Sequence, residues 1–179
     1  VEVLVNNAGF FFFGEVADAP LAKASDMVHL HVLTVSALCT LFAQRMRQRK
    51  CGYILNTSSI SAHKAFPGIA SYGASKAYIR SFTQSLRTEL KYYGVQVTCL
   101  SPGATATALY DPNVINVELG KKVGVMMSAA AVAEAGINSL FKNKAEVVPG
   151  TLTKIMLYLA IVIPHWAIYL IRKHSRYLK

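Results

Sequence analysis

A tyrosine and a lysine stand four positions apart, at Tyr72 and Lys76, and Ser59 precedes the tyrosine by thirteen positions (72 − 59). Residues i and i+4 share one face of a helix, so the ammonium of Lys76 can lie beside the phenol of Tyr72. A nearby cation favours the phenolate and lowers the pKa of a tyrosine from about 10. The spacing predicts that Tyr72 is the general acid and base of an alcohol–carbonyl interconversion, with Ser59 holding the carbonyl oxygen.

Two turns flank these residues, each directly after an apolar run. The turn at residues 6–9, Asn-Asn-Ala-Gly, follows a run that is typical of a short buried parallel strand. Pro102-Gly103 follows the run at 95–100, which indicates another strand. A Tyr-x-x-x-Lys pattern is weak alone, because many chains contain it by chance. Its spacing to Ser59 and the two turns together make chance a poor explanation.

The combination resembles the active site of the short-chain dehydrogenase/reductase superfamily, closely over residues 1–110 and loosely over 111–164. The resemblance implies an α/β fold with a doubly wound, Rossmann-like parallel sheet, of which residues 1–150 would supply strands four to seven. It implies an NAD(P)-dependent oxidoreductase acting on a small-molecule carbonyl or alcohol. Tyr72 would exchange a proton with the substrate, Lys76 would bind the nicotinamide ribose, and Ser59 would position the carbonyl.

The same resemblance implies a set of cofactor-binding residues. The turn after the first strand would lie along the adenosine side of the dinucleotide, and the loop after the strand at 95–100 would contact the nicotinamide carboxamide. The residues so implied are Asn7, Ala8, Gly9, Tyr72, Lys76, Pro102, Gly103, Thr105 and Thr107. The coenzyme would be NAD or NADP, with NADP favoured, and no metal ligands are predicted.

One position departs from the family pattern. Helical periodicity runs over residues 20–50, and the family keeps an Asn in the middle of this helix, where a break lets it hold a water in the proton relay. His31 stands at that position. A histidine can both donate and accept hydrogen bonds. Two interpretations therefore stay open: His31 holds the water, or it is a neutral helix histidine without a catalytic part.

Four consecutive phenylalanines, residues 10–13, follow the first turn. They could pack beneath the next helix, cover the substrate cleft, or face a partner or a membrane; we favour packing in the core. Further along, residues 108–127 would form the substrate lid. Ser128 is a good N-cap for a helix that ends near Lys142, and residues 145–148 are expected to form the last strand.

Residues 151–179 are predicted to form a hydrophobic and basic helical tail. Between 155 and 171 the chain carries no charge. Three interpretations stay open: a helical hairpin lying on a membrane or on its own fold, a core or dimer-contact helix, and a transmembrane helix at the lower limit of length. Trp166 and the basic end suit a membrane interface. Relatives with similar extensions imply a lipophilic substrate (lipid, steroid or acyl) and a location in the cytoplasm or at the endoplasmic reticulum membrane.

The 19 Lys and Arg residues outnumber 9 Asp and Glu, giving a formal net charge of +10. No nucleic-acid-binding motif accompanies this excess, so no nucleic-acid partner is predicted. Three cysteines, an odd number without close pairing, indicate reduced and buried thiols. The small residues Gly73, Ala74 and Ser75 allow close helix packing, and the family resemblance implies a homo-oligomer.

The nucleotide-binding fingerprint of the family, Thr-Gly-x-x-x-Gly-x-Gly, does not occur in the 179 residues, which begin with Val1 inside a strand pattern. We expect either about 80 further residues upstream, the size of a three-strand half, or a degenerate copy, with a strand edge left exposed. A second class of function therefore stays open: a non-catalytic, membrane-associated fragment that serves as a binding partner.

Overall fold

The computed structural model describes residues 1–107, 109, 117–122 and 124–174. Nine residues of the predicted substrate lid, 108, 110–116 and 123, therefore lie outside the described residues. Within the lid the structure describes α4 (Val117–Lys122) and the first residue of β5 (Met127–Ser128). β5 pairs in parallel with β4 (Thr105–Ala106), which precedes the lid.

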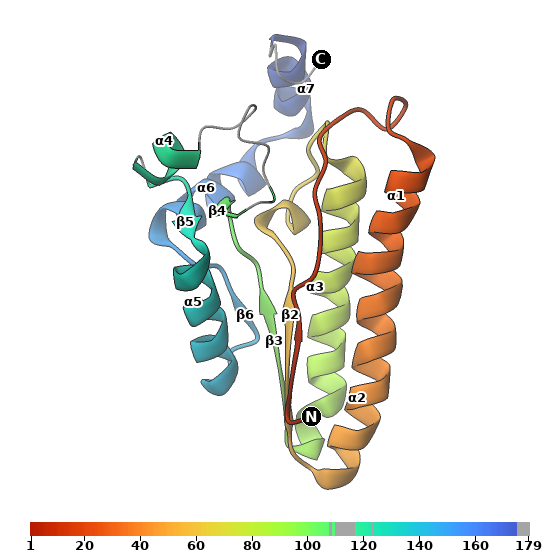
Figure 1. Cartoon of the computed structure of the whole chain (residues 1–179). Coiled ribbons are helices and arrows are strands. Elements are labelled where there is room, and N and C mark those ends of the chain that lie inside the picture. The colour runs from red at the N-terminus through yellow and green to blue at the C-terminus, as the bar shows by residue number, and fades with distance from the viewer. Residues whose placement is uncertain (108, 110–116, 123, 175–179) are drawn as a thin grey trace.

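The main sheet has four parallel strands in the order β1-β2-β3-β6 (Figure 1). Their bounds are β1 (Val3–Asn6), β2 (Gly52–Thr57), β3 (Val95–Leu100) and β6 (Glu146–Val147). This order, with helical connections between the strands, confirms the predicted Rossmann-like parallel sheet. The last strand lies where it was expected, after a helix that Ser128 caps through its side chain.

Helices cover both faces of the sheet (Figure 1). One face packs against α2 (Val35–Arg49) and α3 (Ala70–Leu90), and the other packs against α5 (Ala129–Phe141). Successive side chains of a strand point to opposite faces of the sheet, so each strand contributes to the apolar cores on both faces. Ile54 packs with Leu4 and Ile79 on the α3 side, whereas the next residue, Leu55, packs with Val132 on the α5 side.

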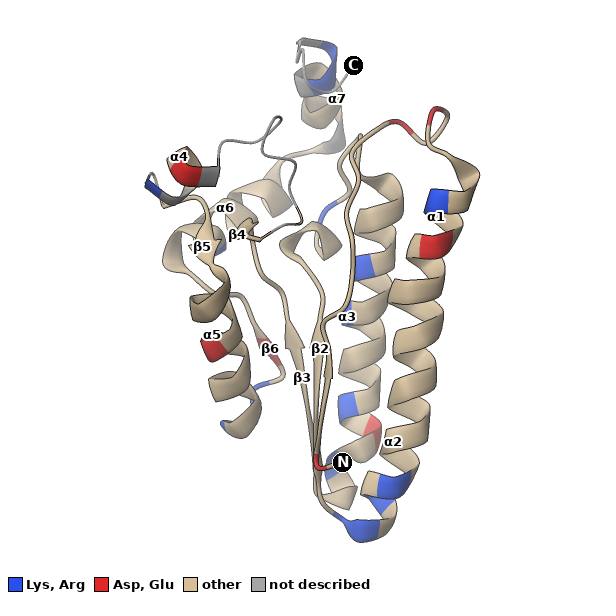
Figure 2. Cartoon of the chain, viewed as in Figure 1, with Lys and Arg blue, Asp and Glu red and all other residues tan. Residues whose placement is uncertain are grey.

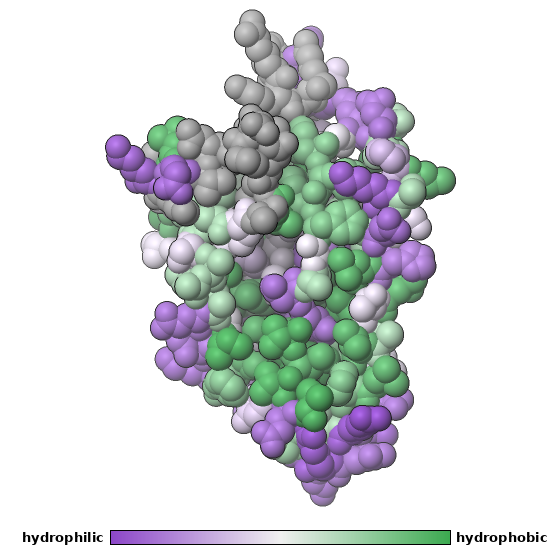
Figure 3. All heavy atoms as spheres, viewed as in Figure 1, coloured by the Kyte–Doolittle hydropathy of each residue, from purple (hydrophilic) through white to green (hydrophobic). Residues whose placement is uncertain are grey.

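The edge strand β1 exposes part of its apolar surface. Val3 and Val5, which alternate with the buried Leu4, are 37% and 46% exposed. Figure 3 shows an apolar surface in this region, bounded by hydrophilic side chains. Figure 2 shows basic side chains at the C-terminal end of α2, where positive charge complements the helix dipole. These are Arg45, Arg47, Arg49 and Lys50.

A buried amide cluster fastens the strand ends to the helices. The Asn6 amide donates to Asn56 Oδ1 at 2.8 Å, and the Asn56 amide donates to Thr83 Oγ1 at 3.0 Å. Cys39 lies against both asparagines. Buried polar groups stabilise a fold only when they are paired, so the cluster fixes β1 and β2 relative to α3. Cys99 is also buried, but Cys51 is exposed, which differs from the expectation for all three thiols.

The helix predicted over residues 20–50 does not break in the middle. It runs as α1 (Leu21–Val28), the π-helical segment η1 (His29–Thr34) and α2. π-Helical turns inside α-helices are frequent at functional sites, and His31 lies in this one. By length and composition the run Leu21–Arg49 is long and apolar enough to cross a membrane, but one of its faces is buried in the fold.

The tail forms two short helices, α6 (Thr151–Val162) and α7 (His165–His174). They are separated at Pro164, which cannot continue a helix because it lacks an N–H donor. A helix of 12 residues is about 18 Å long, well short of the hydrocarbon thickness of a bilayer, about 30 Å. The interpretation of the tail as one spanning helix is therefore wrong, and a pair of short helices replaces it.

Glu146, on β6, connects four segments at the carboxyl end of the sheet. Its carboxylate accepts hydrogen bonds from Arg80 and Gln84 on α3, from Ser101 after β3, and from His63 after the Ser59 segment. Burial would raise the pKa of Glu146, but the hydrogen bonds and charge of Arg80 and the hydrogen bond from Ser101 outweigh it and lower the pKa.

We expect Glu146→Gln to lower the free energy of unfolding by about 1–3 kcal/mol at neutral pH, because the amide cannot accept all of these bonds. A lowered carboxyl pKa stabilises the fold above the unfolded pKa, and this contribution disappears as the pH falls through the folded pKa. The deficit of the variant should therefore shrink in acid. Urea unfolding at neutral and acid pH measures it. Glu134→Gln, at an exposed α5 position, is the control and should change little.

Candidate active site

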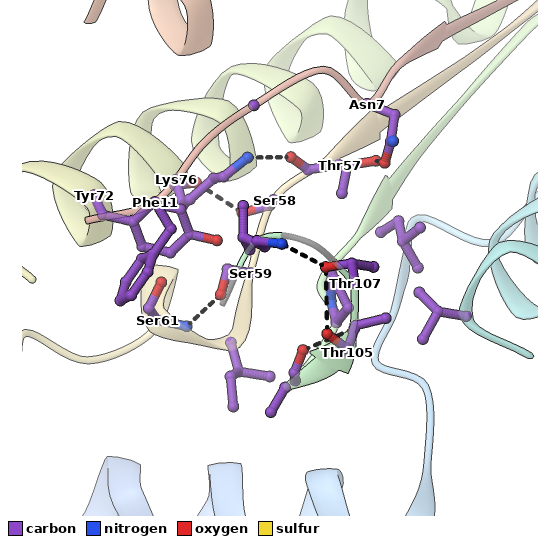
Figure 4. A pocket seen from close by; sticks show the side chains of 18 of the residues that line it. Asn7, Phe11, Thr57, Ser58, Ser59, Ser61, Tyr72, Lys76, Thr105 and Thr107 are labelled. Atoms are coloured by element: carbon purple, nitrogen blue, oxygen red, sulfur yellow. Dashed lines mark hydrogen bonds between the residues drawn. The ribbon is translucent and has the colours of Figure 1, made fainter. Parts of the chain in front are cut away.

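A cavity of about 1150 Å³ opens at the carboxyl ends of β1, β2 and β3. Open parallel sheets bind ligands at this edge. The cavity wall includes Ser59, Tyr72 and Lys76, which come from the segment after β2 and from α3. Figure 4 shows these three side chains on the same wall. The three residues predicted to do the chemistry are therefore brought together at one site.

Lys76 is the buried cation of the site, with 5% of its surface exposed. Its Nζ donates to the Thr57 carbonyl oxygen at 3.0 Å. Thr57 Oγ1 in turn donates to Asn7 Oδ1 at 3.1 Å, so the ends of β1 and β2 are joined beside the ammonium (Figure 4). Burial lowers the pKa of Lys76 to about 8. None of the salt bridges found among the described residues involves Lys76.

Tyr72 lies one helical turn before Lys76, as their spacing predicts. The Lys76 ammonium is 5.7 Å from the centre of the Tyr72 ring. The Phe11 ring meets the Tyr72 ring edge-on, with centroids 5.0 Å apart and planes at 89°. The ring of Tyr72, the predicted acid–base residue, is thus held by an aromatic contact with Phe11 that the sequence spacing did not predict.

Ser59 begins the short helix η2 (Ile60–Ala62), where its Oγ accepts a hydrogen bond from the Ser61 N–H at 3.2 Å. That bond leaves the hydroxyl hydrogen of Ser59 for a carbonyl oxygen in the cavity. Ser58, the residue before Ser59, is buried and donates to the Lys76 carbonyl oxygen at 2.7 Å. Ser58 therefore ties the end of β2 to α3, a role that spacing did not reveal.

The predicted cofactor-binding residues lie around the same cavity, with one exception. Those that line it are Asn7, Gly9, Tyr72, Lys76, Pro102, Gly103, Thr105 and Thr107. Ala8 is exposed and is not among the lining residues, because it lies between two residues that face the cavity. Thr105 and Thr107 are linked along their own loop, since Thr107 Oγ1 donates to the Thr105 carbonyl oxygen at 3.4 Å (Figure 4).

His31 is fully buried beside the cavity. Burial, and secondly the charge of Lys76, lower its pKa to about 4, so the imidazole is neutral at physiological pH. One ring nitrogen, Nε2, accepts from the Phe10 N–H at 3.3 Å, and the other, Nδ1, lies 2.9 Å from Ser75 Oγ. Both ring nitrogens are bonded within the protein, which favours the second interpretation, a neutral histidine whose ring does not hold the water.

The phenylalanine run forms part of the cavity wall rather than the core. Phe10, Phe11 and Phe13 line the cavity, and Phe13 is 52% exposed. Core packing was therefore the wrong choice among the three alternatives for this loop. Phe12, which does not line this cavity, lies under the Lys23 ammonium of α1, 5.2 Å from its ring centre.

The opposite wall includes a segment that sequence reasoning did not connect with the site. Met156, Leu157 and Ala160, all on α6, line the same cavity as Tyr72. The N-terminal turn of α6 lies close to the Pro102–Gly103 turn, since a Cβ on Gly103 would come within 2.7 Å of Thr153 Cγ2. The tail is apolar on every side, so its sequence gave no signal of the face that would turn to the cavity.

Comparison with known proteins assigns the chain to a family. The model of the short-chain dehydrogenase family matches residues 1–118. A dehydrogenase/reductase SDR family member 7B from Bos taurus is 30% identical over 177 residues, which cover 95% of this chain and 51% of that protein. An uncharacterized oxidoreductase, YusZ, from Bacillus subtilis is 29% identical over 116 residues, covering 65% and 41%.

Solved structures agree on the fold. A short-chain dehydrogenase from Sphingobium yanoikuyae, in complex with NADPH, has a TM-score of 0.77 at 22% identity and covers all of this chain and 67% of that one. A gluconate 5-dehydrogenase from Burkholderia cenocepacia, in complex with NADP and tartrate, has a TM-score of 0.75 at 22% identity, covering 87% and 65%.

The parallel sheet and the Ser–Tyr–Lys site at its carboxyl edge define a domain of the dehydrogenase type. The chain belongs to the short-chain dehydrogenase family, as its resemblance in sequence implied. It spans about half the length of the curated relatives that it matches.

Replacing Lys76 by Met should change how stability depends on pH. The folded pKa of about 8 lies below the ordinary 10.5, so the buried ammonium destabilises the fold below pH 8 and this cost disappears as the pH rises towards 10.5. Between pH 7 and pH 10 we expect wild type to gain about 2–3 kcal/mol relative to Lys76→Met. Urea unfolding at both pH values measures this gain; parallel pH dependence of the two proteins would contradict the buried-cation account.

Proposed function

We propose that this chain carries the catalytic centre of an NAD(P)-dependent oxidoreductase that interconverts an alcohol and a carbonyl. The observation that carries the proposal is the convergence of Ser59, Tyr72 and the buried Lys76 ammonium on one cavity. In the reducing direction the Tyr72 hydroxyl gives its proton to the carbonyl oxygen, while the Ser59 hydroxyl holds that oxygen in place. In the oxidising direction the Tyr72 oxygen takes the proton back.

Lys76 supports this proton transfer by its charge and by its position. An ammonium has three N–H donors, and the hydrogen bond to the Thr57 carbonyl oxygen engages one of them. The positive charge favours the phenolate of Tyr72 over the phenol. A pKa of about 8 keeps Lys76 largely charged at neutral pH, so the stabilisation is available under working conditions.

The residues around Lys76 suit a nicotinamide dinucleotide. The ammonium is buried, none of the salt bridges found in the described part of the chain engages it, and it therefore offers donors to the hydroxyls of a ribose. Gly9 leaves room beside it, since a Cβ there would lie 3.6 Å from Lys76 Nζ and only 2.7 Å from His31 Nε2. The bound nicotinamide would supply or accept the hydride. The coenzyme is NAD or NADP, and we favour NADP.

We propose a lipophilic substrate of the lipid, steroid or acyl type. The cavity is walled by aromatic side chains of the 10–13 loop on one side and by aliphatic side chains of α6 on the other. Apolar walls with a few convergent polar groups bind largely apolar ligands and orient them by those groups. Ser59 and Tyr72 would be the orienting pair.

We also propose that α6 and α7 contact a membrane surface. Both helices expose large apolar side chains: Ile155, Tyr158, Leu159, Val162, Trp166, Tyr169 and Leu170. Lys154 and Lys173 are exposed on the same helices, and no Asp or Glu occurs after residue 146. Apolar and aromatic side chains beside cations favour binding at an anionic membrane surface. The proposed location is the cytoplasm or the endoplasmic reticulum membrane.

A homo-oligomer is proposed on the exposed face of α3. Ala74, Tyr78 and Ser81 are exposed there. Ala74 and Ser81 are small, and small residues on one helix face allow a second helix to approach closely.

Tyr72→Phe in the intact protein should reduce turnover by at least about 10²-fold, the lower range for loss of an acid–base residue, while coenzyme binding changes little. Turnover is measured with NADPH and NADH against lipophilic ketones, and binding by nicotinamide fluorescence. Tyr78→Phe, two turns further along α3 with its hydroxyl bonded to Ser36, is the matched control and should keep its activity.

Unchanged turnover in Tyr72→Phe would refute the acid–base role. If neither NADH nor NADPH binds the 179-residue chain, the second class of function, a non-catalytic fragment that serves as a binding partner, is favoured for that polypeptide. Saturable binding rejects that class.

Membrane contact predicts a fluorescence change, because Trp166 is the only tryptophan in the chain and is 68% exposed. Vesicles rich in phosphatidylserine should shift its emission to the blue, and the shift should weaken with neutral phosphatidylcholine and at high salt. A double variant of α6, Ile155→Ser with Leu159→Ser, should weaken the binding. Leu21→Ser, at an apolar position of α1 that is 84% exposed, is the control; equal binding by all three proteins would contradict the proposal.

A further inference from the structure

We propose that His31 is a positioning residue: a neutral imidazole with its proton on Nδ1, it fastens the 9–11 segment to α3 and so sets the ring of Tyr72. The link to catalysis rests on the function proposed above for Tyr72, whereas the protonation and the contacts of His31 are independent of it.

The direction of every hydrogen bond around His31 is fixed by its partners. The Phe10 backbone N–H can only donate, so Nε2, at 3.3 Å, accepts and carries no proton. In a neutral imidazole the proton is then on Nδ1, which donates to Ser75 Oγ at 2.9 Å.

The hydrogen bonds of Ser75 also place the imidazole proton on His31 Nδ1. Its hydroxyl donates to the Tyr72 carbonyl oxygen at 2.8 Å, because a carbonyl can only accept. The hydroxyl hydrogen is used there, so Ser75 Oγ must accept from His31. One ordered series of hydrogen bonds therefore leads from the Phe10 amide through His31 and Ser75 to the backbone of Tyr72.

The surroundings of His31 keep it in this single state. The ring is fully buried in η1 and faces α3, which contributes two titratable groups, the Lys76 ammonium and the Tyr72 phenol. The 7–13 segment contributes none. A second proton on the imidazole would sit beside the Lys76 charge and would remove the acceptor of the Phe10 amide.

Aromatic contacts carry this arrangement to Tyr72. The His31 and Tyr72 rings meet edge-on with centroids 5.9 Å apart, and Phe11, the residue after Phe10, meets Tyr72 on another side. Gly9 makes room for the imidazole, because a Cβ there would lie 2.7 Å from Nε2. His31 is thus bonded to the Phe10 backbone beside Tyr72 and, through Ser75, to the backbone of Tyr72 itself.

The first test is the ¹⁵N spectrum of the imidazole in the 179-residue chain. Between pH 5 and pH 8 we expect the shift pair of a neutral Nδ1–H tautomer, without titration. The Nε2–H tautomer, or titration near the ordinary pKa of about 6.5, would overturn the proposal. Catalytic activity does not enter this measurement, so its outcome is separate from that of Tyr72→Phe.

The second test compares His31→Gln with His31→Asn. The longer Gln places an oxygen near the position of Nε2 and keeps an acceptor for the Phe10 amide, whereas Asn is too short. Hydrogen exchange of the Phe10 amide should rise about tenfold in His31→Asn, equivalent to one net hydrogen bond, and stay close to wild type in His31→Gln. In the intact protein kcat should fall in the same order while the KM of the coenzyme stays unchanged. Equal behaviour of the two variants would overturn the proposal.

Discussion

The burial of the Lys76 ammonium is the constraint on which the site depends. A buried cation is costly unless polar atoms surround it, and here the end of β2 supplies them. The Thr57 carbonyl accepts from Nζ, and Ser58 holds the Lys76 backbone. Thr57, the last residue of β2, and Ser58, which follows it, thus bond the side chain and the backbone of the same lysine. Ser59 follows them directly in the chain, so the same contacts also place its hydroxyl at the cavity.

Two polar clusters stabilise the contact between the end of β2 and α3. The Asn6–Asn56–Thr83 cluster fixes β1 and β2 on α3 beneath the site. Glu146 fixes α3 to the segments that follow β3 and η2. Directional hydrogen bonds at both levels therefore hold the elements that carry Ser59 and Tyr72. The hydrogen bonds of His31 to Phe10 and Ser75 form a third cluster, which fixes the aromatic 10–13 loop to α3.

Local patterns predicted the strands, the main helices and the Ser59, Tyr72 and Lys76 set, because strand runs and i, i+4 spacing express geometry that neighbouring residues share. They failed where contacts are long in range. Glu146 lies 45 positions from Ser101, and Phe10 lies 21 from His31, and no periodicity connects such pairs. The wall formed by α6 was missed for another reason: a helix that is apolar on every side carries no directional signal.

The hydrogen bonds that hold the proposed catalytic residues Lys76, Ser59 and Tyr72 are made by other residues of this chain. These bonds come from β2, η2 and α3, all within residues 52–90 of this chain. A chain that spans about half the length of its relatives thus brings Ser59, Tyr72 and Lys76 together, and apolar side chains of the 10–13 loop and of α6 line the same cavity. Preorganisation of this kind lowers the barrier to reaction because no reorganisation remains at the moment of proton transfer. For the proposed function, changes to α6 should therefore alter the range of substrates, whereas changes around Lys76 should alter the reaction rate.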